Sequence, residues 1–256
     1  MNVTDVLKTG ASRSVERNGL FLMGIVFVLS AVNGLLGFGI ARWAAEQGGG
    51  TAAPQSDPAI LLAVGLAGLL SLAIGVATIV VSIAAIRVFV SDETERLPRE
   101  YFTRNVGWAT LNFIVGAIVF GIVVALGFVA LILPGIFLLV TLAFWSVYVA
   151  VEDQNFVRGF RSSWALTRGY RLDLVLLGVA VLLVTLALNV VFGVGNLAGA
   201  GVGLVFAQIG SAIATVFSTA VLATAYNELT ARSAEEEGTI PSSRGATPAD
   251  DAAESV

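Results

Sequence analysis

The sequence predicts an all-α polytopic membrane protein with six transmembrane helices, arranged as three helical hairpins with cytoplasmic amphipathic lead-in helices. Composition is the first observation behind this fold class: of 256 residues, 57% are apolar and only 12% are charged, about half the charged share of a soluble domain. The second observation is the spacing of the charges. Four stretches contain none, namely Gly19–Ala41, Pro58–Ile86, Asn105–Val151 and Leu174–Asn227. Since roughly 20 helical residues cross the ~30 Å hydrocarbon core, the first two stretches hold one span each and the last two hold two each.

The basic residues indicate how the chain is threaded. Of the 14 Lys and Arg residues, all except Arg42 fall on one side of the predicted spans. The positive-inside rule makes that side cytoplasmic. We therefore expect a multi-pass protein of the cell membrane with its N- and C-termini in the cytoplasm. The first apolar stretch is long enough to span and begins only after 18 mostly polar residues, so we interpret it as an uncleaved anchor.

The stretch Asn105–Val151 needs a turn between spans three and four. Pro134 and Gly135 predict a tight helical hairpin at that point. One span plus a re-entrant hairpin, turning at the same residues, is the alternative. Arginines on both flanks, Arg104 and Arg158, require the cytoplasmic side and favour an even number of crossings.

The turn at Pro134 and Gly135 would leave a short span four. It would end in Trp145 and Tyr148, residue types that are typical of the membrane interface. Between spans five and six, Asn196–Gly201 predicts the outer turn, because it combines a polar Asn with flexible glycines.

Two parts follow from this reading: a six-helix transmembrane domain at 1–227 and a tail at 228–256. The tail contains Glu235–Glu237, two prolines and a run of small polar residues. That composition is typical of a disordered acidic segment, here cytoplasmic. A weak repeat also precedes spans one, three and five: Val15–Asn18, Phe102–Asn105 and Leu166–Gly169. Its alternative explanation is chance similarity among basic residues placed before spans.

The cytoplasmic segment Asn155–Arg171 carries the candidate contact residues. Aromatic residues recur every four positions in it and so share one helix face, while arginines occupy other faces. Such a helix can lie in the headgroup layer and contact anionic lipid phosphate or a partner protein. The second interpretation, which we favour for this segment, is that it only packs the lead-in helix onto the bundle and anchors span five. The candidate contact residues are Phe156, Arg158, Phe160, Arg161, Trp164 and Arg168.

Glu152 and Asp153 are adjacent carboxylates at the predicted cytoplasmic end of span four. They could hold a divalent cation, but such ions usually need six or more ligands and no third acid lies near in the sequence. We favour a structural role, in which Glu152 forms an ion pair with Arg161 or Arg168 and fixes the hairpin to its lead-in helix. We expect no metal and no cofactor.

The intramembrane polar residues are few. Asn33, Asn112, Asn189 and Gln208 could line a path for a neutral solute, although such amides more often form hydrogen bonds between helices. The spans also contain stripes of small residues, which allow close helix packing or self-association. No charged residue lies within the four stretches, and intramembrane charges are the usual mark of ion pathways.

A family resemblance rests on three segments in a fixed order: Leu133–Leu138, Val149–Glu152 and Arg161–Gly169. They resemble the membrane domain found beside glycerophosphoryl diester phosphodiesterases and the related stand-alone six-helix proteins, including archaeal ones. The resemblance implies a six-helix membrane domain whose own biochemical role is not established. It does not imply phosphodiesterase activity, because that activity belongs to a separate metal-dependent barrel for which this chain has no room.

These observations favour a protein that is not an enzyme. The chain has no His and no Cys, which removes the commonest general base, thiolate nucleophile and zinc ligands. We expect a non-catalytic module that organises lipid or a partner protein at the cytoplasmic membrane face. The alternative is a transporter or channel for a small neutral solute. Expected partners are membrane lipids, with a protein partner or a second copy of the chain also open, and no nucleic acid.

Overall fold

The computed structural model describes residues 1–46, 58–91 and 98–239, and every regular element in these ranges is a helix. The elements are α1 (Val3–Ser14), α2 (Arg17–Glu46), α3 (Pro58–Val90), α4 (Glu100–Thr103), α5 (Val106–Ala130), α6 (Ile132–Thr141), α7 (Trp145–Val151), α8 (Phe156–Leu166), α9 (Arg171–Gly193), the 3₁₀ helix η1 (Val194–Ala198) and α10 (Ala200–Thr239).

Six segments of the described chain are long and apolar enough to cross a membrane. They are Arg17–Trp43, Leu62–Val90, Val106–Ala130, Ile132–Val151, Arg171–Ala198 and Ala200–Glu235. The prediction of an all-α fold with six helices of membrane-spanning length is therefore confirmed.

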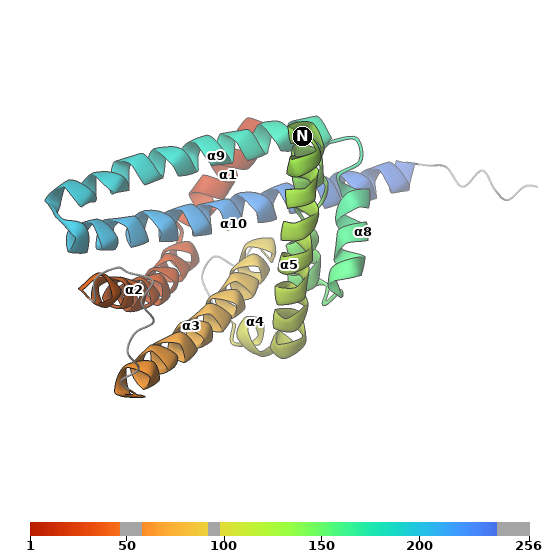
Figure 1. The fold of residues 1–256 in the computed structure, drawn as a ribbon. Helices are drawn as coiled ribbons and strands as arrows, with labels where there is room; N and C mark the ends of the chain where they lie inside the picture. Colours follow the sequence, from red (N-terminus) through yellow and green to blue (C-terminus); the bar gives the residue numbers. More distant parts are fainter. Residues whose placement is uncertain (47–57, 92–97, 240–256) are drawn as a thin grey trace, which may run out of the picture.

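Helix α10 is central to the arrangement, because it contacts α1, α2, α3 and α9. Consecutive candidate spans also contact each other in pairs: α2 with α3, α5 with α6, and α9 with α10. In Figure 1, α9 and α10 run side by side in opposite directions, whereas α5 runs across their direction. The short helices α1, α4 and α8 directly precede α2, α5 and α9 in the chain.

Buried side chains gather towards one end of the long helices. There the ring of Tyr226 from α10 packs against Phe144 and Tyr148, with ring centroids 6.2 and 5.4 Å apart. A second cluster includes Leu22 of α2 and Val216 of α10. The other ends of α2, α3 and α9 expose large apolar side chains. This division suits helices whose far portions face acyl chains and whose near portions pack on one another.

The turn between α5 and α6 lies at Leu131, so the turn predicted at Pro134 and Gly135 was misplaced by about three residues. Leu131 is extended, with φ −165° and ψ 152°, and α6 begins at Ile132. Pro134 therefore lies in the first helical turn, where its missing N–H has no intrahelical partner to lose. Gly135 has a structural role, because a Cβ atom there would lie 2.5 Å from the ring of Phe128.

The segment after α6 contains Trp145 and Tyr148, the aromatic residues that we expected at the end of span four. Both are buried among other helices. A turn lies within Asn196–Gly201, as predicted: η1 ends at Ala198, and Gly199 has a φ of +109° immediately before α10. That left-handed conformation explains the glycine.

The end of α10 changes the boundary that we expected at residue 227. The helix continues to Thr239, and Leu229 is fully buried. Glu228 accepts a hydrogen bond from Arg232 one turn later, at 2.8 Å. Residues 240–256, the rest of the predicted tail, lie outside the described residues.

Candidate functional site

Helix α8 is fixed at its start by two asparagine side chains. Asn155 is its N-cap, and its Oδ1 accepts a hydrogen bond from the backbone N–H of Arg158 at 2.9 Å. The backbone N–H of Phe156 donates to Oδ1 of Asn112 on α5, at 3.2 Å. Two of the N–H groups that a helix start leaves without partners are thus satisfied. Asn112, one of the predicted amides, holds two elements together.

The aromatic face of α8 turns towards the bundle. Phe156, Phe160 and Trp164 are all half-buried. The ring of Phe160 lies 5.5 Å from Trp145 of α7, and the ring of Trp164 lies 5.4 Å from Phe137 of α6, both edge-on. This packing gives the three aromatic residues the docking role that we favoured from the sequence.

A break in the fourth candidate span lies beneath α8. Helix α6 ends at Thr141 and α7 begins at Trp145. The hydroxyl of Ser163, which is fully buried, accepts from the N–H of Phe144 at 3.1 Å and donates to the carbonyl of Thr141 at 2.8 Å. Since irregular backbone at membrane depth must find partners within the protein, Ser163 makes the break tolerable.

The predicted arginines lie on the outer side of this unit. Arg158, Arg161 and Arg168 are exposed. None of the three has an ion-pair partner within residues 1–46, 58–91 and 98–239. Exposed arginines without internal partners can bind phosphate groups through their planar N–H donors.

Arg171 is a further basic residue of this surface that we did not single out from the sequence. Its guanidinium lies over the rings of Phe137 and Trp164, 4.8 and 5.2 Å from their centroids. Its Nε is buried and lacks a hydrogen-bond partner in the described chain. The signal in the sequence was its position three residues before the uncharged run Leu174–Asn227 and seven residues after Trp164, the last residue of the aromatic stripe.

Arg87 forms a second basic centre, at the end of α3. It is only 5% exposed. Its Nε donates to the carbonyl of Ala150 at 2.6 Å, and one terminal nitrogen donates to the carbonyls of Tyr101 and Arg104 at 3.0 and 2.9 Å. The other terminal nitrogen lies 3.3 Å from Asp153. This guanidinium ties together α3, α4 and α7.

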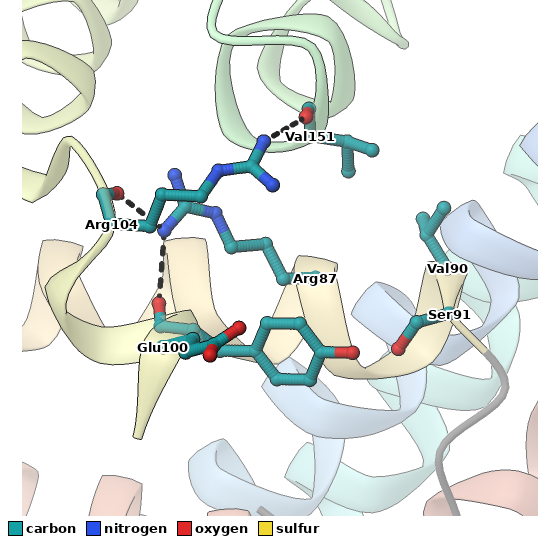
Figure 2. Close-up of a pocket in the computed structure, with 7 residues that line it drawn as sticks. Arg87, Val90, Ser91, Glu100, Arg104 and Val151 are labelled. Carbon is teal, nitrogen blue, oxygen red and sulfur yellow. Dashed lines mark hydrogen bonds between the residues drawn. The ribbon is translucent and has the colours of Figure 1, made fainter. Parts of the chain in front are cut away.

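A pocket of about 280 Å³ lies beside Arg87 (Figure 2). Its lining residues are Arg87, Val90, Ser91, Glu100, Tyr101, Arg104 and Val151. In Figure 2 the side chain of Arg104 passes over that of Arg87 and reaches the carbonyl of Val151, at 3.1 Å. Since both arginines are already bonded to protein groups, the pocket has fewer free donors than the surface of α8.

The structure assigns the two adjacent carboxylates different partners from those predicted. Asp153, not Glu152, forms the ion pairs, with Arg87 and with Arg104 at 3.3 and 3.0 Å. Glu152 instead accepts hydrogen bonds from the hydroxyl of Tyr226 at 2.8 Å and from Gln154 at 2.7 Å. The prediction of an ion pair from Glu152 to Arg161 or Arg168 was wrong. The reason is that Glu152 is engaged by Tyr226 and Gln154, whereas Arg161 and Arg168 are exposed.

The remaining amides do not converge. Asn33 and Asn189 are exposed, and Asn189 donates only to Thr185 of its own helix at 2.8 Å. Gln208 lies against Gly34. None of these side chains lines the pocket beside Arg87, nor a smaller pocket of about 180 Å³ between α2 and α3. The geometry therefore gives no support to a polar solute path through them.

The helices and the arginine-rich end define an α-helical multi-pass membrane protein. Within that class, the chain belongs to the family DUF7847, described as a domain of unknown function, whose model matches residues 1–230. The search of curated proteins found no match, and neither did the search of solved structures.

Proposed function

We propose that this protein is a non-catalytic membrane module that binds anionic lipid at the cytoplasmic face through α8 and the residues that follow it. The observation that carries the proposal is the division of α8 into two faces. Its aromatic residues dock on α6 and α7, while Arg158, Arg161 and Arg168 remain exposed and lack ion-pair partners in the described chain. A docked helix holds its arginines in fixed positions, so phosphate binding costs little further ordering.

The topology that we propose with this function has three helical hairpins, α2–α3, α5–α6 and α9–α10. The short helices α1, α4 and α8 precede them on the cytoplasmic side. Both termini lie in the cytoplasm, and the membrane is the cell membrane. The positive-inside rule supports this orientation, since the arginines of α3, α8 and the start of α9 belong to one side of the predicted spans. The resemblance to membrane domains beside a lipid-headgroup enzyme supports a lipid setting.

The expected strength follows from the number of arginines. A basic residue near an anionic membrane surface contributes about 1 kcal/mol at moderate ionic strength. Three such residues contribute about 3 kcal/mol, which corresponds to a preference for anionic over neutral lipid of about 100-fold. Because this attraction is screened by salt, the preference should fall as the ionic strength rises.

Native mass spectrometry of the protein, released from bilayers with equal phosphatidylglycerol and phosphatidylcholine, tests the proposal. We expect phosphatidylglycerol to be retained by the natural chain and lost from the variant with Arg158→Gln, Arg161→Gln and Arg168→Gln. The matched triple Lys variant keeps the charge and should keep most of the lipid. Arg42→Gln, on the opposite side, should change nothing.

Two results would count against this function. Equal phosphatidylglycerol retention by the natural chain and the triple Gln variant would leave α8 with only its packing role. A stoichiometric protein in place of the lipid, released together with the natural chain from its own membrane, would identify a partner protein as the occupant.

A further inference from the structure

We propose that the α5–α6 hairpin lies along the cytoplasmic leaflet instead of crossing the bilayer, so that only α2, α3, α9 and α10 span it. The apolar side of α5 would face acyl chains, and α8 would cover the hairpin on the headgroup side. This inference deepens the proposed function and uses its assignment of the basic ends to the cytoplasmic side. The inference rests on the contacts that the two ends of the hairpin make with the ends of other helices.

The end of α3 and the start of α9 lie at one level along α10. The side chain of Asn227 donates to the carbonyl of Val90 at the end of α3, at 3.0 Å. The next residue, Glu228, accepts from the backbone N–H of Asn2 at 3.3 Å. The terminal amine of Met1 lies 3.3 Å from Asp173 at the start of α9. Because Asn227 and Glu228 are consecutive residues of α10, the end of α3 and the start of α9 lie at the same height along α10.

One end of the hairpin unit lies at this level through Arg87. The Nε atom of Arg87 bonds the carbonyl of Ala150, and Arg104, just before α5, bonds the carbonyl of Val151. Tyr226 adds a bond to Glu152. The beginning of α5 and the end of α7 therefore both lie beside the end of α3.

The opposite end of the hairpin returns to the same level. Phe137 of α6 packs under the guanidinium of Arg171, the first residue of α9, at 4.8 Å. If α6 and α7 stood upright, Phe137 would lie about 20 Å deeper than Ala150, since 13 residues separate them. An arginine at the start of a span extends its side chain towards the headgroups, not down the span. An upright hairpin cannot make both the contact of Arg87 with Ala150 and the contact of Arg171 with Phe137.

Helix α8 gives an independent measure of the same geometry. Its first residue, Phe156, donates a backbone hydrogen bond to Asn112 of α5, and its Trp164 packs on Phe137 of α6. The neighbouring Leu138 lies beside Gly127 of α5. Helix α8, with 11 residues and a length of about 16 Å, therefore runs along α5 from Asn112 towards Gly127. In an upright hairpin the exposed Arg168 and the whole start of α9 would lie near the outer surface. Helix α9, about 34 Å long, would then project out of the membrane.

The surface of α5 fits a helix lying in a leaflet. One stripe of large apolar side chains is exposed on it: Leu111, Val115, Ile118, Ile122 and Leu126. Residues that α5 buries, such as Asn112 and Gly116, lie on another face and contact α7 and α8. In Figure 1, α5 runs across α9 and α10, as this placement requires. A layer with arginines on one side and apolar residues on the other is typical of interfacial helices.

Spin-label depth measurements in bilayers test the proposal, and the absence of cysteine in the chain makes single-site labelling direct. Nitroxides are attached to cysteines at the five exposed positions of α5, and their accessibilities to oxygen and to a nickel chelate are compared. We expect nearly equal depths. An upright helix would give depths changing over about 22 Å, with a maximum in the middle, and that result overturns the proposal.

Helix α9 supplies a matched control with almost the same spacing of exposed residues. These are Leu172, Leu176, Val179, Leu183 and Leu186. Labels there should show the progressive change in depth that α5 lacks. An equally flat profile on α9 would overturn the proposal, because the hairpin would then not differ from the spans.

A second readout separates this inference from lipid binding. In intact cells, an impermeant maleimide should label Leu197→Cys of η1 from outside and should not label Leu133→Cys at the exposed tip of the hairpin. Labelling of both overturns the leaflet placement. If instead α5 gives a flat depth profile while the triple Gln variant still retains anionic lipid, the placement stands and the arginines lose their proposed function.

Discussion

Replacement of Arg87 is the most severe perturbation that we predict for this protein. The side chain is 5% exposed and donates to three backbone carbonyls as well as to Asp153. Arg87→Leu would leave the carbonyls of Ala150, Tyr101 and Arg104 without this donor. Removing one partner of a buried ion pair typically costs about 3–5 kcal/mol of folding free energy. Asp153 limits the loss, because Arg104 and Asn105 still bond it, at 3.0 and 3.3 Å.

A graded series sharpens this prediction. Arg87→Lys keeps the charge but has no planar fork, so it can satisfy only some of the acceptors and should lose about 2 kcal/mol. Asp153→Asn leaves the three carbonyl bonds of Arg87 in place and should lose about 1–2 kcal/mol. The exposed Arg158→Gln serves as the control and should stay within about 0.5 kcal/mol of the natural chain.

The assay is reversible unfolding in mixed micelles with increasing denaturing detergent, followed by the fluorescence of the natural tryptophans. The free energy of unfolding should fall in the order Arg158→Gln, Asp153→Asn, Arg87→Lys, Arg87→Leu. If Arg87→Leu were as stable as Arg158→Gln, the guanidinium would not tie α3 to α4 and α7, and our account of this centre would be refuted.

Three further predictions use the same unfolding measurement. Ser163→Ala leaves the N–H of Phe144 and the carbonyl of Thr141 without their partner at the break between α6 and α7, so it should cost about 1–3 kcal/mol; a loss as small as that of the half-buried Ser162→Ala would contradict this role. Gly135→Val forces a branched side chain against Phe128 and should cost about 1–3 kcal/mol, whereas Gly178→Val, where a Cβ would meet nothing within 4 Å, should cost less. Tyr226→Phe removes the bond to Glu152 and should cost about 1–2 kcal/mol; no change would mean that water replaces the hydroxyl equally well.

The sequence was sufficient for the number and length of the apolar helices, because charge-free runs report directly on membrane-length segments. It misplaced the turn at Pro134, because proline suits a loop and the first turn of a helix equally well. The true turn at Leu131 has no distinctive residue. The arms meet there through tertiary packing, of Gly135 against Phe128 and of Gly127 against Gly135 and Leu138.

The partners of the charged residues were harder to predict than the helices. Glu152 and Asp153 are equivalent in the sequence. They differ in their partners, Tyr226 for the first and Arg87 with Arg104 for the second, which come from distant parts of the chain. Arg87 had a signal that we did not use, since Ile86, Val88 and Phe89 surround it with apolar residues. An arginine inside such a run is expected to face protein groups.

The two proposals support each other through the way the carboxylates are engaged. Asp153 bonds Arg87 and Arg104, and Glu152 bonds Tyr226, so neither neutralises the arginines of α8. If the hairpin lies in the leaflet, Arg158 and Arg168, at the two ends of the row of arginines, both lie near the headgroups. The lipid phosphates then supply the negative charges that pair with these arginines, which the described chain does not supply. An upright hairpin would place one end of that row far from the cytoplasmic headgroups, and the three arginines would not act on one surface. The depth of α5 therefore decides whether α8 can bind lipid as a unit.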